Sequence, residues 1–365
     1  MPDNIRSLDS TYLTHSIYGV IGSKKRLLGF MIRRRDYILE LRGESEWAMR
    51  ILFVTDDITF VGGIQSYLGQ LCTTLTENGH STELFSPKGD RVRDLFSRWI
   101  SLNYYREFRS RLLKFNPDLV HAHSLSLQLS PLPLKAAADL NIPIVMTIHD
   151  FNYVCPRKWL IRKNGEICAP GIGFRCFWSD CRSSKEGWIY FGYHGLRLLK
   201  ILLHRRLLQR YVSLFVCPSK VLQKSVNRSW GIRDSAWVPN FIHSHSRPDV
   251  RRPRTDLLYV GRLSPEKGIE TLISSFPAVL RSFPDVHLKI IGGGPDEQRL
   301  KSLSKSTGLQ SRIQFLGIVE NQMIREHFKS ALLSIIPSIW METVSYTHLR
   351  AHETSLHLVC RLLLE

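Results

Sequence analysis

The sequence predicts an α/β protein made of two Rossmann-like domains with parallel sheets, and three observations support this fold class. Short runs of buried-type residues alternate with segments of helical periodicity along most of the chain. The alternation occurs twice, on either side of the polar, basic and proline-containing stretch 243–254. In both halves a glycine-containing turn follows the first strand, where α/β proteins bind their ligands.

Residues 49–242 form the predicted N-terminal domain. A strand is expected at 51–55 and a loop at 56–63, which ends with Gly62 and Gly63. Paired glycines let the backbone approach a ligand where a Cβ atom would clash. A helix face then follows at Ile64, Leu68, Leu71 and Leu75. Further strands are expected at 118–121, 144–148 and 214–217, and 243–254 is expected to be the linker.

Residues 255–343 form the predicted C-terminal domain. Strands are expected at 257–260, 287–291, 313–316 and 332–336. Helices are expected to begin near Gly268, Pro295 and Glu320. Three glycines, 292–294, separate the second strand of this domain from its helix, so this loop also favours close approach of the backbone.

The segment 257–273 carries a pattern that suits phosphate binding. An apolar run ends at Gly261, the cations Arg262 and Lys267 follow, and Gly268 precedes an amphipathic segment with apolar residues at Ile269, Leu272, Ile273 and Phe276. Backbone N–H groups at a helix N-terminus attract anions, and the two cations would add charge and donors. The alternative is a strand–loop–helix unit whose cations face water.

Composition limits the class of partner. The chain has 365 residues and a net charge of +18, which favours an anionic partner such as nucleic acid, an acidic membrane or a phosphorylated ligand. Nucleic acid is disfavoured because the chain lacks a basic–aromatic platform and any zinc-finger or helix-turn-helix spacing. No apolar run approaches the ~18 residues of a membrane span. Seven cysteines in a chain of this length favour a reducing cytoplasm.

The first 48 residues are expected to be an extension of the domain or a spurious translation, with Met49 as the true start. They are dense in positive charge and carry scattered apolar residues. The alternative is a basic amphipathic element on a membrane surface.

Several segments together point to a family. In order they are GGIQSYLGQL, VHAHS, TIHD, VCPSK, VPN, YVGRLSPEKGIETLI, IIGGGP, FLG and PSIWMET. This ordered set, from Met49 to about Thr343, resembles the family 4 glycosyltransferases. The resemblance implies the GT-B fold, in which two Rossmann-like domains face a cleft. It also implies a retaining transfer of sugar from a nucleoside-diphosphate sugar, with no metal required for catalysis.

The resemblance also implies roles for single residues. Arg262 and Lys267 match the family's cations on the donor diphosphate, and Gly63 would face the same phosphates. The loop 292–294 and the region 315–317 would line the nucleobase pocket. Glu342 matches a glutamate on the donor sugar hydroxyls, and His149 a histidine near the sugar and the leaving oxygen. The expected site residues are therefore His149 and Glu342 for catalysis, with Gly62, Gly63, Gly261, Arg262, Lys267, Gly292, Gly293 and Gly317 for the donor. His149 has the alternative of a structural role at a strand end.

Two further features concern metal and membrane. Cys155, Cys168, Cys176 and Cys181 fall within one loop-like window and suit a structural zinc ion, the alternative being buried free thiols. Residues 196–211 (LRLLKILLHRRLLQRY) form a basic amphipathic helix that suits contact with an anionic membrane, the alternative being a core helix with a solvated charged face. An acceptor that is a glycan or a lipid-linked molecule, at the inner face of the membrane, fits the second feature.

The tail 344–365 departs from the family pattern. Arg350 stands where the family has its second glutamate, and the codons of 344–354 and 358–365 resemble translated sequencing adapter. We therefore expect a non-native tail and an incomplete second domain, which would expose apolar surface and impair activity. The alternative function is a fragment that binds nucleotide sugars without transferring them.

Overall fold

The structure is a computed structural model that describes residues 48–56, 63–87, 102–123, 125, 129–157, 160, 162, 168, 172–173, 176, 188–232, 235–240 and 255–339. The chain divides into two compact units, one on each side of the Phe241–Ile242 bond. Residues 1–47 of the expected N-terminal extension, the whole linker 243–254 and the tail lie outside the described residues, as do Gly62, Cys181 and Glu342.

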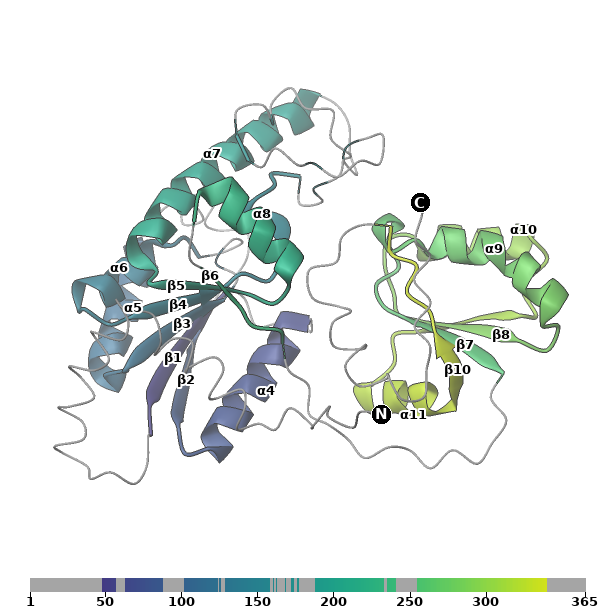
Figure 1. The fold of residues 1–365 in the computed structure, drawn as a ribbon, viewed down its shortest axis with the longest axis horizontal. Coiled ribbons are helices and arrows are strands. Elements are labelled where there is room, and N and C mark those ends of the chain that lie inside the picture. The colour runs from purple at the N-terminus through teal and green to yellow at the C-terminus, as the bar shows by residue number, and fades with distance from the viewer. Residues whose placement is uncertain are drawn as a thin grey trace, which may run out of the picture. The chain divides into compact units, whose positions relative to one another are not determined.

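Unit 1 is built on a six-stranded parallel sheet in the order β2-β1-β3-β4-β5-β6 (Figure 1). Its strands are β1 (Arg50–Thr55), β2 (Ser81–Phe85), β3 (Leu119–His123), β4 (Ile144–Thr147), β5 (Leu214–Cys217) and β6 (Ser235–Trp237). Its helices are α4 (Gly63–Glu77), α5 (Leu102–Phe115), α6 (Leu132–Asp139), α7 (Trp188–Tyr211) and α8 (Lys220–Trp230), with a short 3-10 helix η2 (Phe151–Tyr153).

Helix α4 covers one face of this sheet. Leu68, Leu71 and Leu75 of α4 pack against alternate residues of the strands, such as Ile51 and Phe53 of β1. The predicted helix face is therefore confirmed, and α4 ends at Glu77, directly before Asn78 and Gly79, where Gly79 has a φ of +81°.

Unit 2 is built on a four-stranded parallel sheet in the order β10-β7-β8-β9. Its strands are β7 (Asp256–Val260), β8 (His287–Ile291), β9 (Ile313–Gly317) and β10 (Ala331–Ser334). Its helices are α9 (Ile269–Ser282), α10 (Glu297–Ser306) and α11 (Asn321–Ser330), with a 3-10 helix η4 (Pro265–Lys267). Helices α9 and α10 cover one face and α11 the other (Figure 1).

The buried face of α9 is the one that the sequence predicts, namely Ile269, Leu272, Ile273 and Phe276. Other boundaries differ. Strand β3 continues to His123 instead of ending at 121, because both of its histidines are buried in the core. The last strand ends at 334 rather than 336, and α7 begins eight residues before the expected 196. Gly63 belongs to α4 and not to the loop before it.

Candidate active site

In unit 2 the loops that follow β7 and β8 are joined by backbone hydrogen bonds. The amide of Leu263 donates to the carbonyl of Gly293 at 3.0 Å, and the amide of Asp296 donates to the carbonyl of Leu263 at 3.1 Å. The amide of Gly292 donates to the carbonyl of Gly317, the last residue of β9, at 2.7 Å. Four of the predicted donor residues therefore stand on one interlocked set of loops: Gly261, Gly292, Gly293 and Gly317.

The glycines of these loops are required by the loops themselves. A Cβ atom on Gly292 would lie 1.9 Å from the carbonyl oxygen of Gly261, and one on Gly294 would lie 2.2 Å from that of Leu263. A Cβ atom on Gly268, where φ is +69°, would lie 2.0 Å from the carbonyl oxygen of Pro337. We expected the loop 292–294 to allow close approach of the backbone, and in the structure the close approach at Gly292 and Gly294 is made to neighbouring turns of the protein.

The two predicted phosphate ligands follow this loop set. Arg262 is exposed, and its carbonyl accepts a hydrogen bond from the hydroxyl of Tyr259 at 3.0 Å, which holds the backbone of the turn. Lys267 is the last residue of η4 and is half-buried, one glycine before α9 begins. Both cations therefore stand within seven residues of the N-terminus of α9, whose free amides carry partial positive charge.

The same turn anchors the segment that leads toward Glu342. The amide of Ile339 donates to the carbonyl of Glu266 at 3.1 Å, and the Glu266 carboxylate accepts a hydrogen bond from the Ser264 hydroxyl at 2.6 Å. The residue before the undescribed segment is thus fixed next to η4, the turn that carries Lys267.

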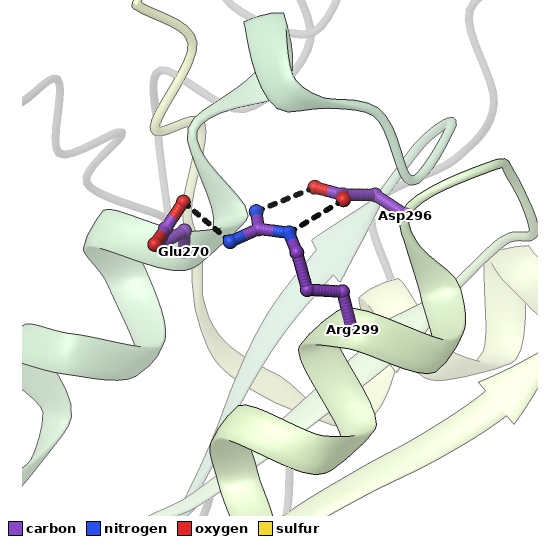
Figure 2. Close-up of polar contacts among 3 residues, drawn as sticks. All are labelled: Glu270, Asp296 and Arg299. Atoms are coloured by element: carbon purple, nitrogen blue, oxygen red, sulfur yellow. Dashed lines mark hydrogen bonds and ion pairs between the residues drawn. The ribbon is translucent and has the colours of Figure 1, made fainter.

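A three-residue ion cluster joins the starts of α9 and α10 (Figure 2). Arg299 donates from Nε and Nη2 to both carboxylate oxygens of Asp296, at 2.7 and 2.8 Å. Its Nη1 lies 2.8 Å from the carboxylate of Glu270, in the first turn of α9. The bidentate geometry fixes the direction of the guanidinium group. Sequence reasoning missed this cluster, which holds the loop 292–296 against the first turn of α9.

In unit 1 the candidate site is a cluster of three buried histidines at the carboxyl ends of β3 and β4. His149 follows β4 and is 3% exposed, and His121 and His123 lie on β3. Nδ1 of His123 and Nε2 of His149 are 2.8 Å apart, within hydrogen-bonding distance. Nε2 of His121 lies 2.8 Å from the hydroxyl of Thr147.

Tyr67 of α4 closes the cluster. Its ring makes a T-shaped contact with the His149 ring, with centroids 5.6 Å apart, and it is one helical turn after Gly63. The structure therefore brings the first turn of α4 to His149. The family pattern includes the segment VHAHS, but sequence reasoning assigned no role to its histidines or to Tyr67.

Burial keeps all three imidazoles neutral. It lowers the pKa of His149 to about 4 and, with a contribution from the charge of His149, that of His121 to about 3. Burial and the two neighbouring histidines also hold the pKa of His123 well below its usual range. At neutral pH the cluster offers hydrogen bonds rather than charge.

Three of the four cysteines line one cavity of about 10 Å³, which is about the volume needed to hold one water molecule. Cys155, Cys168 and Cys176 line it, together with Arg157 and several apolar residues. Burial, and more weakly the charges of Cys155 and Cys168, raise the pKa of the Cys176 thiol. Within the described residues no three His, Cys, Asp or Glu side chains are arranged to hold a metal ion.

Helix α7 carries an exposed leucine stripe, defined as Leu196, Leu199 and Leu203. These side chains are 58%, 47% and 38% exposed, whereas Leu198 and Leu208 on the opposite face are buried. The helix therefore differs from the predicted one, which had one apolar and one charged face. Its outward face carries leucines together with Arg206 and Arg210. No helix among those described has the length and apolar character needed to cross a membrane.

Comparisons with known proteins identify the family. The profile of "Glycosyltransferase Family 4" matches residues 61–245, which is half of the chain. The chain belongs to glycosyltransferase family 4. The profile "Glycosyl transferases group 1" matches residues 244–360 of this glycosyltransferase, and thus includes most of the tail that the sequence analysis set apart.

Individual relatives agree with this assignment. An uncharacterized glycosyltransferase of Methanocaldococcus jannaschii is 29% identical over 80% of this chain and 75% of its own length. The phosphatidyl-myo-inositol mannosyltransferase of Mycobacterium leprae is 36% identical, but over only 30% of each chain. The protein is thus a transferase enzyme of this family.

Solved structures show that the fold is GT-B. The sucrose-phosphate synthase of Thermosynechococcus elongatus has a TM-score of 0.56 at 15% identity, covering 86% of this chain and 81% of its own. Anabaena HepE, in complex with UDP-glucose, has a TM-score of 0.52 at 16% identity, covering 82% and 76%. The predicted fold class, two Rossmann-like domains with parallel sheets, is confirmed.

Proposed function

We propose that this glycosyltransferase moves a sugar from a nucleoside-diphosphate sugar to a glycan or lipid-linked acceptor, with retention of anomeric configuration. The observation that carries the proposal is the placement of Arg262 and Lys267 beside the N-terminus of α9, on loops that are locked by hydrogen bonds. Fixed cations and free amides can stabilise the charge that develops on a departing diphosphate without a catalytic metal.

The remaining roles are assigned as the family pattern implies. Gly63 and the glycine-containing loops 261–263 and 292–294 would contact the donor through the backbone. His149 would contact the sugar or the leaving oxygen, and Glu342, outside the described residues, would bind sugar hydroxyls. HepE was solved with UDP-glucose, which supports a nucleotide-sugar donor and leaves its base and sugar to experiment.

A donor panel tests the proposal. Release of nucleoside diphosphate from UDP-, GDP- and ADP-sugars should occur with one of them, and the product linkage should keep the donor's anomeric configuration. Arg262→Ala should weaken binding of that diphosphate about tenfold or more, since a charge-assisted contact is lost. Arg281→Ala, at the other end of α9, should leave binding unchanged. Equal effects of the two variants would contradict the assignment of Arg262.

The second candidate function is binding of nucleotide sugars without transfer. Arg350, at the position of the family's second glutamate, favours it. Tight binding of a nucleoside diphosphate with neither transfer nor hydrolysis of any donor would establish this second function and rule out the first for the chain as it stands.

The leucine stripe of α7 supports contact with an anionic membrane, and hence a lipid-linked acceptor used in synthesis of the cell envelope. Exposed leucines can enter the lipid interface while Arg206 and Arg210 meet anionic headgroups. The M. leprae relative is named for a lipid acceptor, phosphatidyl-myo-inositol.

Vesicle flotation tests the membrane contact. The protein should float with phosphatidylcholine vesicles that contain phosphatidylglycerol and remain behind with phosphatidylcholine alone. Leu196→Glu should lower the vesicle affinity about tenfold, because it removes apolar contact and adds repulsion. Leu113→Glu is the matched control, since Leu113 is a 57% exposed leucine on α5. An equal loss in both variants would contradict a specific role for α7.

A further inference from the structure

The contact between His123 and His149 leaves only one nitrogen of His149 for a ligand. Nε2 of His149 and Nδ1 of His123 share a hydrogen bond of 2.8 Å in the core. Within the described residues, Nδ1 of His149 has no hydrogen-bond partner. A ligand that meets this imidazole would therefore meet Nδ1.

The neighbours of the pair prevent the His149 ring from turning over. The His123 ring stacks on it with centroids 5.1 Å apart and an angle of 23°, and the Tyr67 ring of α4 makes a T-shaped contact with it. His121 lies 4.2 Å from His123, centroid to centroid, and is itself tied to Thr147. A ring flip of His149 would break a buried hydrogen bond and leave its partner unsatisfied, which is costly.

The chemistry of the pair also limits what His149 can do. In many enzymes a histidine that takes up a proton has a carboxylate behind it, which stabilises the imidazolium. Here the group behind His149 is another imidazole, which supplies no negative charge. Among the described residues, the titratable groups that face the ring are His121 and His123 of β3 and Tyr67 of α4. Their neutral forms are favoured by the same burial that keeps His149 neutral.

We propose that His123 is a positioning residue, which engages Nε2 of His149 and thereby presents Nδ1 to the substrate as a neutral hydrogen-bonding group. The inference rests on the proposed function, because it takes His149 to be the residue that meets the sugar or the leaving oxygen. His149 takes up no proton in the reaction on this view.

Replacements of His149 separate the two nitrogens. The side-chain nitrogen of asparagine stands as many bonds from Cα as Nδ1 does, and that of glutamine stands farther out, near the place of Nε2. His149→Asn should therefore keep kcat/KM within about tenfold of the natural enzyme, whereas His149→Ala and His149→Gln should each lose about 100-fold. An asparagine variant as impaired as the alanine variant would overturn the proposal, since a proton acceptor cannot be replaced by an amide.

Replacements of His123 test positioning. His123→Leu fills the space without a hydrogen bond and should lower kcat about tenfold with little change in the donor KM. His123→Asn places an amide where Nδ1 was and should recover kcat to within about threefold. Thermal unfolding should be measured for both variants. Equal kcat in the two variants, at equal thermal stability, would contradict the positioning role.

A spectroscopic measurement separates failure of this inference from failure of the proposed function. In the full chain with 15N-labelled histidine, the ring nitrogens of His149 should change chemical shift in His123→Leu and return toward the natural values in His123→Asn, whatever the activity. Unchanged His149 shifts in His123→Leu would overturn the engagement of Nε2. The expected shifts together with an absence of turnover would reject the proposed function and leave the pairing intact.

Discussion

Replacing Gly294 with alanine tests whether the loop glycines serve the protein itself. The new Cβ atom would lie 2.2 Å from the carbonyl oxygen of Leu263, and 2.7 and 2.8 Å from its carbonyl carbon and amide nitrogen. Ordinary contacts require more than 3 Å, so the backbone at Leu263 must move by about 1 Å. That movement strains two hydrogen bonds, from Leu263 to Gly293 and from Asp296 to Leu263. With ~1 kcal/mol for each bond and 1–3 kcal/mol for overpacking, we expect a loss of about 3–5 kcal/mol in the free energy of unfolding of unit 2.

Gly308→Ala is the matched control. Gly308 has a φ of +69°, but its Cβ atom would meet nothing within 4 Å, so only the left-handed backbone is penalised, by about 1 kcal/mol. Urea denaturation followed by circular dichroism, with hydrogen exchange of peptides from β7 and β8, gives the free energy of unit 2. A Gly294→Ala loss no larger than that of Gly308→Ala would refute the reasoning. It would show that the loop adapts to the added methyl group.

Three further predictions concern the Arg299 cluster, the buried histidines and the cysteines. Arg299→Met should destabilise unit 2 by only about 1 kcal/mol, because the arginine side chain is 48% exposed, and the loss should shrink at high salt. Urea denaturation in about 0.1 M and about 1 M NaCl measures this loss, and a loss independent of salt would contradict the prediction. The folded pKa values of His121, His123 and His149 lie below that of an unfolded histidine, so the unfolded state binds more protons from pH 6.5 down to about 4. Stability is full above pH 6.5 and should fall by about 2 kcal/mol per histidine at about pH 5, as urea denaturation across that range measures, and a flat profile would contradict the buried cluster. If Cys181 completes the predicted zinc site with Cys155, Cys168 and Cys176, the purified protein should carry about one zinc ion by mass spectrometry, and Cys155→Ser should lose it. An unsubstituted protein that contains no metal and is as stable as Cys155→Ser would show that the cysteines are free thiols.

The sequence predicts the parts of the fold that depend on local patterns. The α9 face at Ile269, Leu272, Ile273 and Phe276 is found as expected, because each residue sits one helical turn or less from the next and all meet the sheet. Strands β2 and β6 were missed because their sequences, STELF and SAW, have no continuous apolar run; both strands lie at the edges of the sheet. Edge strands are half-exposed, so their composition resembles that of loops.

Only part of the candidate site could be predicted from local sequence patterns. The sequence predicts Arg262, Lys267 and the glycines as donor ligands because a family pattern and a helix start coincide at 261–269, and this role stays a prediction. The pairing of His123 with His149 depends on the register of β3 beside β4, in which His123 stands opposite Thr147. Likewise the Arg299 cluster joins side chains 29 positions apart, Glu270 and Arg299. Contacts of this kind come from tertiary packing, which a residue-spacing argument does not reach.

In the interlocked loops of unit 2, substitutions at the glycines and substitutions at the exposed positions have different consequences. Their geometry is set by backbone atoms, with Gly292 against the Gly261 carbonyl, Gly294 against the Leu263 carbonyl and Gly268 against the Pro337 carbonyl. Side chains at the intervening exposed positions contribute nothing to this contact. Substitution of the outward residues therefore leaves this backbone contact intact, whereas a side chain at any of the three glycines would disrupt it.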